Sequence, residues 1–142
     1  WYDPIFKRAA ETFYKTPYLF GGDRTEGKSD GPWDCAGWVM ECFDAAGIDI
    51  APDHSQGNTN DQRLREACLP LTEGNAKVGD LVFFEGTYNT AGASHVGIVW
   101  APSTKTMADD HDRGNNTGPG LSVWNQAGSW GKYPRTFGRV KR

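Results

Sequence analysis

Apolar residues recur with a helical period in the first half of the chain and with a strand-like period in the second. The first helical stripe is predicted to begin with Asp3 as N-cap and Pro4 in the first helical position, and to continue to about Tyr14. The pair Thr16-Pro17 then ends it. The apolar residues of this stripe are Ile5, Phe6, Ala9 and Phe13.

A second helical stripe lies between Asp34 and Ala46 and carries a cysteine at its start. Its apolar positions form one face and are Cys35, Trp38, Val39, Cys42 and Phe43. Asp34 is a suitable N-cap, and Gly47 follows the last periodic residue as a suitable C-cap. We therefore expect Cys35 in the first turn of a helix, where unpaired N–H groups and the helix dipole favour negative charge.

The second half contains runs rich in β-branched and aromatic residues, which indicate strands. The predicted strands, in chain order, are 79–84, 95–100, 106–109, 121–124 and 136–140. The third is expected to pair back on the second across a short turn, and a short helix is expected at 62–69. Because helices come first and strands afterwards, the expected fold is α+β with an antiparallel sheet.

Length and charge restrict the classes of protein that fit. At 142 residues the chain is expected to form a single domain, 1–142, and its first residue, Trp1, suggests excision from a longer protein. The net charge of -3 gives no indication of electrostatic binding to nucleic acid. We expect no membrane insertion, since no apolar run approaches the length that a bilayer requires.

The cysteine at the helix start is the best candidate for chemistry. We expect the pKa of the Cys35 thiol to lie below the value of about 8.5 for a free cysteine, which favours a nucleophile. A nucleophilic cysteine needs a general base, and His95 opens the strongest strand, beside Gly97. An isolated histidine there more often caps a strand end, but the helix-start cysteine favours a catalytic pair. The other two histidines are His54 and His111.

Four motifs in order resemble those of the NlpC/P60 cysteine peptidases over nearly the whole chain. They are Tyr18 followed by Gly21-Gly22, Asp34-Cys35-Ala36-Gly37, Gly79-Asp80-Leu81-Val82-Phe83-Phe84, and Ser94-His95-Val96-Gly97-Ile98. The resemblance implies a papain-like α+β fold with the cysteine helix packed on an antiparallel sheet. It also implies a secreted, cell-wall or phage-tail hydrolase that cleaves peptidoglycan stem peptides, typically between D-Glu and a diamino acid. No metal or organic cofactor and no partner chain are expected.

The resemblance assigns roles residue by residue. Cys35 stands at the nucleophile position and His95 at the base position. Tyr18 matches a tyrosine that helps the Cys35 backbone N–H to bind the oxyanion, although a core aromatic role is about equally plausible. Asp34 matches the residue before the nucleophile, where it caps the helix, contacts a substrate amine, or does both. The match of Ser55-Gln56 to a cleft-lining element is loose, and His54 beside it is expected in an exposed loop.

The third catalytic residue departs from the family pattern, which places His, Asn or Gln on the next strand. The candidates here are Asp109, Asp110 and His111. If Ala101 faces Lys105 across a three-residue turn, Asp109 lies opposite Gly97 and diagonal to His95 on the same face. The same register places His111 opposite His95, whereas a one-residue change in the turn favours Asp110. We choose Asp109, because an anion there orients the imidazole and stabilises its charged form. A solvated acidic loop is the alternative interpretation.

Three further features qualify the resemblance. Ala36 stands where many members carry Ser that contributes to an amine pocket, which mildly favours a hydrolase of the intact wall over one restricted to short peptides. Cys42 is expected to be buried, and Cys68 to lie in the core of the short helix. A Cys35–Cys68 disulfide is conceivable and would inactivate the enzyme until reduced.

The alternatives to a stem-peptide endopeptidase fall into two classes. One is a related cysteine hydrolase that cleaves a different bond, such as an N-acetylmuramoyl-L-alanine amidase or a cross-bridge endopeptidase. The other is a non-catalytic wall-binding module of a phage tail or secreted protein. The presence of both Cys35 and His95 argues against the second class.

Overall fold

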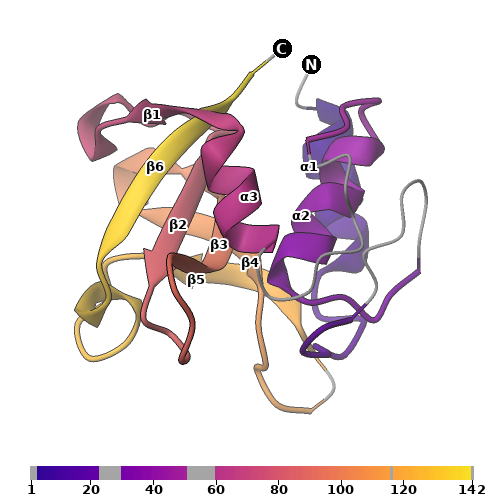
Figure 1. Cartoon of the computed structure of the whole chain (residues 1–142). Coiled ribbons are helices and arrows are strands. Elements are labelled where there is room, and N and C mark those ends of the chain that lie inside the picture. Colours follow the sequence, from indigo (N-terminus) through magenta and orange to yellow (C-terminus); the bar gives the residue numbers. More distant parts are fainter. Residues whose placement is uncertain (1–2, 23–29, 51–59, 116, 142) are drawn as a thin grey trace.

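Helices precede strands along the chain, as the apolar pattern predicts (Figure 1). The computed structural model describes residues 3–22, 30–50, 60–115 and 117–141. In this part the helices are α1 (Asp3–Thr12), α2 (Cys35–Asp44) and α3 (Asn60–Glu66). The strands are β1 (Cys68–Leu71), β2 (Leu81–Glu85), β3 (Ala93–Ala101), β4 (Thr106–Asp110), β5 (Pro119–Val123) and β6 (Arg135–Val140).

α2 begins directly after Asp34, as predicted, but its C-cap is Ala45 rather than Gly47. α1 begins at Asp3 itself, one residue before the expected Pro4, and ends at Thr12 rather than near Tyr14. Asp34 caps α2, because its side chain accepts a hydrogen bond of 2.8 Å from the backbone N–H of Gly37. After α2 the chain turns through Gly47, whose φ of 74° suits glycine. A hydrogen bond joins α1 to α2: the indole N–H of Trp38 donates to Thr12 Oγ1 at 2.8 Å. This bond satisfies a buried indole and fixes α1 against α2.

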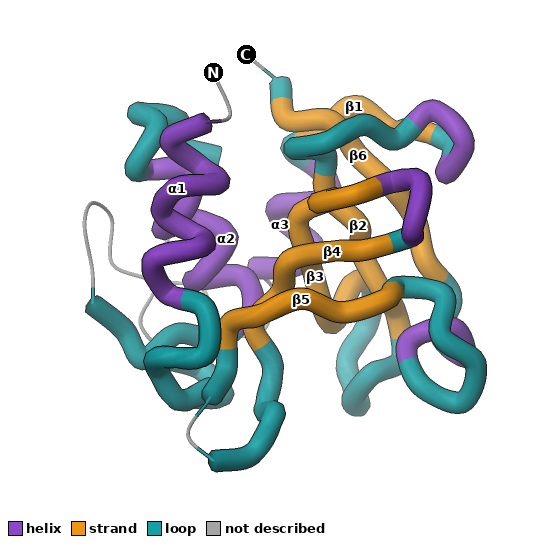
Figure 2. Tube along the Cα trace, turned by 180° about the vertical axis from the view of Figure 1, so that it is seen from behind, coloured by secondary structure: helices purple, strands orange, loops and turns teal. Residues whose placement is uncertain are grey.

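The described strands form one antiparallel sheet in the order β1-β6-β2-β3-β4-β5 (Figure 2). The predicted pairing of Gly97 with Asp109 is confirmed. The turn differs by one residue from the expected one, since Ala101 faces Thr106 rather than Lys105. A register shift between Val99 and Ala101 restores the predicted pairing further along the ladder.

The sheet separates two hydrophobic clusters. The face toward α1 and α2 contributes side chains such as Phe83, Val96 and Ile98 to the first cluster, where they pack on Trp38 and Phe43 of α2. The opposite face contributes the second cluster, whose buried members are Ala76, Val82, Phe84, Val99, Met107, Trp124 and Phe137. Alternate residues of β2 and β3 therefore enter different clusters, as expected for a sheet that is buried on both faces.

The segment after α3 corrects two expectations from the sequence. The predicted helix 62–69 ends early, because α3 stops at Glu66 and Cys68 begins β1. Pro70 explains the change, since proline and the residue before it disfavour helix. All three cysteines lie in the described part of the chain and are buried free thiols, so the conceivable Cys35–Cys68 disulfide is not formed.

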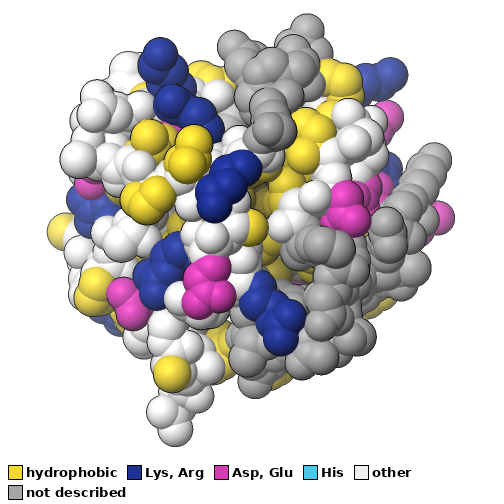
Figure 3. Space-filling view, turned by 45° about the horizontal axis from the view of Figure 1, so that its top comes forward, with side chains coloured by type: hydrophobic (Ala, Val, Ile, Leu, Met, Phe, Trp, Pro, Cys, Tyr) yellow, Lys and Arg dark blue, Asp and Glu magenta, His cyan; other side chains and the backbone are white. Residues whose placement is uncertain are grey.

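The surface shows no single-sign patch on the face drawn in Figure 3, where Lys and Arg side chains are scattered among acidic and polar ones. Among the described residues, no helix is both long enough and apolar enough to cross a membrane.

Candidate active site

The cysteine at the start of α2 contacts both α3 and the sheet. Cys35 is only 4% exposed, and its Sγ donates a hydrogen bond of 3.2 Å to Asp61 Oδ1. Asp61 lies in the first turn of α3 and is itself 4% exposed. The backbone N–H of Val96 in β3 also hydrogen-bonds the sulfur. These contacts place the sulfur beside the peptide bond that joins His95 to Val96.

The Cys35 thiol is harder to ionise than the sequence suggests. Burial raises its pKa well above the usual value, the charges of Asp61 and Asp34 raise it further, and only the Val96 N–H lowers it. The prediction of a lowered thiol pKa at the helix start is therefore wrong for this structure. Its physical reason is that desolvation and two adjacent carboxylates outweigh the helix dipole. Cys35 rests as a neutral thiol.

The His95 imidazole is hydrogen-bonded to Asp109, the residue predicted to orient it. Its Nε2 lies 2.9 Å from Asp109 Oδ2, and both side chains are buried. The indole of Trp130 stacks on the imidazole, with ring centres 4.3 Å apart and planes 15° apart. Phe84, which pairs with His95 across the β2–β3 ladder, contacts the ring from the same face of the sheet. Because Nε2 is engaged by Asp109, Nδ1 is the ring nitrogen that is left to interact with another group.

Asp109 is the centre of a saturated hydrogen-bond network. Its Oδ2 accepts from His95 and, at 2.7 Å, from Nδ1 of His111. Its Oδ1 accepts from Arg113 at 2.8 Å and from the Ser122 hydroxyl at 2.7 Å. Burial by itself would raise the pKa of Asp109, but the hydrogen bonds from His111 and His95 outweigh it and hold the pKa far below its usual range. Asp109 is thus a permanent anion.

The same environment keeps His95 neutral at rest. Burial lowers its pKa, and the positive charges at His111 and Arg113 lower it further, although Asp109 acts in the opposite direction. A neutral imidazole can accept a proton, which is what a general base requires. Among the described residues no hydrogen bond joins the Cys35 sulfur to the His95 ring, so the resting pair is a thiol and a separate imidazole.

Asp110 and His111 do not take the place of Asp109. His111 contacts Asp109 rather than lying opposite His95 in the ladder, because β4 ends at Asp110. The side chain of Asp110 is fully buried, and neither of its oxygens has a hydrogen-bond partner among the described residues. Burial and the charges of Asp109 and Asp34 raise the pKa of Asp110 to about 9.

Tyr18 lies at the cysteine end of α2. It forms an isolated bridge with Trp33, which directly precedes the N-cap Asp34. Burial raises the pKa of its hydroxyl, and negative charge at Cys35, Asp34 and Asp110 raises it further. The hydroxyl therefore stays protonated and can donate a hydrogen bond. The loosely matched residues His54 and Ser55-Gln56 lie outside the described part of the chain.

Three residues of the site were missed from the sequence. Asp61 was placed just before a predicted short helix, and nothing in its local pattern points to a cysteine 26 positions earlier. Arg113 and Trp130 lie outside the family-like motifs, in segments between predicted strands. An arginine four residues after an aspartate is the one local signal that could have indicated the Asp109–Arg113 pair.

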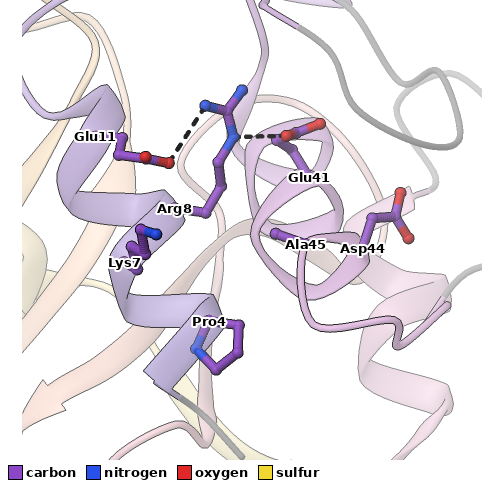
Figure 4. Close-up of a pocket in the computed structure, with 7 residues that line it drawn as sticks. All are labelled: Pro4, Lys7, Arg8, Glu11, Glu41, Asp44 and Ala45. Atoms are coloured by element: carbon purple, nitrogen blue, oxygen red, sulfur yellow. Dashed lines mark hydrogen bonds and ion pairs between the residues drawn. The ribbon is translucent and has the colours of Figure 1, made fainter.

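One hollow lined by described residues adjoins the site, and another lies apart from it. A hollow of about 300 Å³ is lined by His111 and by residues of the Trp130 region, namely Gly128, Ser129, Trp130, Lys132 and Tyr133, with Thr87. A larger one, about 630 Å³, lies between α1 and α2, where Arg8 forms ion pairs with Glu41 and Glu11 (Figure 4). It reaches α2 at Glu41 and beyond, more than a turn from Cys35, so it is separate from the candidate site.

The histidine cluster has the composition of a possible metal site. The ligand atoms of His95, Asp109 and His111 all lie within 4.8 Å of one another. Imidazole and carboxylate are ligands that Zn²⁺ accepts. In this structure Asp109 Oδ2 hydrogen-bonds to both imidazoles, to His95 at 2.9 Å and to His111 at 2.7 Å.

A cysteine that begins a helix, next to an antiparallel sheet carrying a histidine–carboxylate pair, defines a papain-like α+β domain. The chain belongs to the NlpC/P60 family, whose model matches residues 15–117. It is 31% identical over 140 residues to the bifunctional muramidase/DL-endopeptidase CwlT of Bacillus subtilis. That match covers 99% of this chain and 37% of CwlT.

Other relatives agree on the family and on the fold. The chain is 34% identical over 126 residues to the probable endopeptidase p60 of Listeria monocytogenes, covering 87% of this chain and 21% of p60. The chain thus spans 37% of the length of CwlT and 21% of the length of p60. A lipoprotein-like NLP/P60 structure from Staphylococcus aureus superposes with a TM-score of 0.76 at 23% identity, covering 99% of this chain and 41% of that one. RipD from Mycobacterium tuberculosis, a non-catalytic NlpC/P60 protein with a peptidoglycan-binding function, superposes with a TM-score of 0.70 at 16% identity, covering 99% and 97%.

Proposed function

We propose that this chain is the catalytic domain of a peptidoglycan hydrolase, a cysteine endopeptidase that cleaves stem peptides. The observation that carries the proposal is the placement of the Cys35 sulfur at the peptide bond following His95, while Asp109 holds the other side of the imidazole. Nucleophile, base and orienting carboxylate are the three parts that acyl transfer by a thiol requires. The relatives CwlT, a muramidase and DL-endopeptidase, and p60, a probable endopeptidase, support the substrate class.

The reaction starts from two neutral groups. His95 accepts the thiol proton through Nδ1, and the Cys35 sulfur attacks the amide carbonyl to form a tetrahedral intermediate. The buried anion Asp109 stabilises the imidazolium as it forms. His95 then gives the proton to the leaving amine, which breaks the C–N bond and leaves a thioester. Water, deprotonated by His95, hydrolyses the thioester and restores the thiol.

The oxyanion is stabilised at the first turn of α2. The backbone N–H of Cys35 is one donor, and the protonated hydroxyl of Tyr18 is the second. A donor of this kind typically contributes about 3 kcal/mol to the transition state. Asp34 holds the turn by accepting a hydrogen bond from the Gly37 N–H, and we propose that it also contacts a substrate amine.

We propose the bond between D-Glu and the following diamino acid as the one cleaved, on the strength of the motifs. An amidase or a cross-bridge endopeptidase would use the same residues on a different bond. Mass spectrometry of digested muropeptides separates these possibilities, because each leaves a different new amino terminus. The protein is proposed to act at the cell wall, as a secreted or phage-tail component, with 1–142 as one monomeric domain.

The non-catalytic alternative has a specific precedent in RipD. Both Cys35 and His95 are present here and connected to Asp61 and Asp109, which favours an enzyme. A thiol probe at neutral to alkaline pH distinguishes the two readings. Labelling of Cys35 that depends on His95 supports the enzyme, whereas a thiol indifferent to His95→Ala supports a binding module.

The decisive experiment uses Cys35→Ala on purified peptidoglycan. We expect no release of new amino termini by this variant, with an unchanged urea unfolding transition. The matched control is Cys42→Ala, which makes the same substitution on the buried face of the same helix and is expected to retain turnover. Release of the same products by Cys35→Ala would eliminate Cys35 as the nucleophile.

A further inference from the structure

The hollow of about 300 Å³ is fixed to the His95 ring by one short loop. The 3-10 turn η3 (Trp130–Lys132) carries wall residues of the hollow, and the Trp130 indole stacks on the imidazole with ring centres 4.3 Å apart. The loop is braced by its own backbone, because the Gly131 N–H donates to the Gln126 carbonyl at 2.9 Å. Sites for small molecules begin at about this volume, so the hollow can hold one chemical group of a substrate beside the catalytic base.

The hollow lies on the leaving-group side of the proposed reaction. The carbonyl carbon of the cleaved bond meets the Cys35 sulfur at the start of α2, whereas His95 gives its proton to the leaving amine. The wall of the hollow contacts His95 through Trp130 and Asp109 through His111, and none of its described residues belongs to α2. The residue after the cleaved bond is therefore the part of the substrate nearest to the hollow.

The charge on the described wall is positive. The Nζ of Lys132 lies 5.2 Å from the centroid of the Tyr133 ring, which places the ammonium over a second wall residue. Lys132 forms no ion pair with a described residue, and the described wall contains no acidic side chain. A carboxylate is attracted to such a wall, whereas an ammonium group would be repelled by Lys132.

We propose that this hollow is a subsite for a carboxylate on the leaving-group side of the cleaved bond, and that Lys132 selects it. This inference rests on the proposed function, in which the residue after the cleaved bond is a diamino acid. The carboxylate can come from two parts of the substrate, the side chain of a dicarboxylic diamino acid or the carboxyl terminus of a short stem peptide. Both groups are ionised at neutral pH.

Lys132 acts on binding rather than on bond breaking. Its side chain is exposed, so water partly screens the ion pair, and a pair of this kind changes affinity by about fivefold. The carboxylate keeps its charge throughout the reaction, so the contact is as strong in the ground state as in the transition state. The selection therefore appears in KM, with kcat little changed. A defect transmitted through the stack of Trp130 on His95 would instead lower kcat.

The first test measures binding without cleavage. Calorimetry in the Cys35→Ala chain compares three stem tripeptides that end in meso-diaminopimelate, one with both of its carboxyl groups free, one with the side-chain carboxyl amidated and one with the terminal carboxyl amidated. We expect at least one amidated peptide to bind about fivefold more weakly than the free one, and the position of that amide identifies the source of the carboxylate. Equal affinity for all three peptides would overturn the proposal.

The second test changes the cation in the same Cys35→Ala background. Lys132→Gln should lose the preference for the free peptide, Lys132→Arg should keep it, and Lys132→Glu should reverse it. The matched control is Lys105→Gln, because Lys105 also lies over an aromatic ring, that of Trp124, but does not line the hollow. This control is expected to keep the preference. A preference that survives in Lys132→Gln would overturn the assignment.

The third test measures cleavage of the same peptides by the parent chain. The KM for the free peptide should be about fivefold lower than for the amidated one at low salt, with similar kcat. The difference should shrink at about 1 M salt, where the screening length is about 3 Å. A preference that lies in kcat and resists salt would refute a charge contact. If the parent cleaves none of the peptides, the proposed function fails, while the binding experiments still decide the carboxylate subsite.

Discussion

Replacing Asp110 by Asn should stabilise the protein at neutral pH, although the residue is fully buried. The carboxyl has no hydrogen-bond partner among the described residues, and burial together with the charges of Asp109 and Asp34 raises its pKa to about 9. In the folded chain Asp110 is therefore a neutral acid at pH 7. Asparagine has nearly the same shape and polarity as that neutral acid but cannot ionise after unfolding.

The magnitude follows from proton linkage. In the unfolded chain the pKa of an Asp is about 3.9, so between about pH 4 and about pH 9 the folded state binds one more proton at Asp110 than the unfolded state does. The free energy of unfolding therefore falls as pH rises through this window. At pH 7, about three units above the unfolded value, the loss amounts to about 4 kcal/mol at about 1.36 kcal/mol per unit.

Urea unfolding followed by tryptophan fluorescence measures the effect. Asp110→Asn should exceed the parent in stability by up to about 4 kcal/mol at pH 7, and the difference should shrink toward zero near pH 4. Asp112→Asn, two residues along on the exposed loop, is the matched control and should follow the parent. Parallel pH curves for parent and Asp110→Asn would refute a protonated carboxyl at this position.

Three further predictions test the network around Asp109. Arg113→Met should lower the free energy of unfolding by about 3 kcal/mol, because it leaves a buried carboxylate without its charge partner, and Arg113→Lys should recover part of the loss in urea titrations. Because the pKa of Asp109 is lowered in the folded chain, its contribution to the free energy of unfolding should be present above about pH 4 and decline as acid protonates it. A parent chain whose stability does not fall in acid would contradict this. Gly97→Ala should reduce kcat well before it unfolds the chain, because the added methyl would lie 2.9 Å from Met107 Sδ and 3.2 Å from the Cβ of Asp109. An unchanged kcat would show that the ladder yields without moving the carboxylate.

The pairing of β3 with β4 shows what the sequence could predict. Alternation along both strands placed Asp109 opposite Gly97, on the face that carries His95, and this register is observed. The assumed turn was wrong by one residue, and the irregularity between Val99 and Ala101 compensates for it. The alternation of hydrophobic and polar residues predicts on which face of the sheet a residue lies, but no comparable sequence pattern predicts the position of a bulge.

Electrostatics at the nucleophile could not be predicted in the same way. The start of a helix is a local feature, and it correctly placed Cys35 and its cap Asp34. Whether the thiol ionises depends on how deeply α2 is buried and on Asp61, which tertiary packing brings from α3. A helical period gives neither quantity, and here burial and the adjacent carboxylates outweigh the effect of the helix dipole on the thiol pKa.

The hydrogen bond from the Cys35 thiol to Asp61 also affects how readily the sulfur is oxidised. Peroxide attacks thiolates in preference to thiols, and enclosed sulfurs react more slowly than accessible ones. A sulfur that is protonated and 4% exposed should thus resist conversion to sulfinic acid. The contact that keeps the Cys35 thiol protonated is therefore also a protection of its sulfur against oxidation.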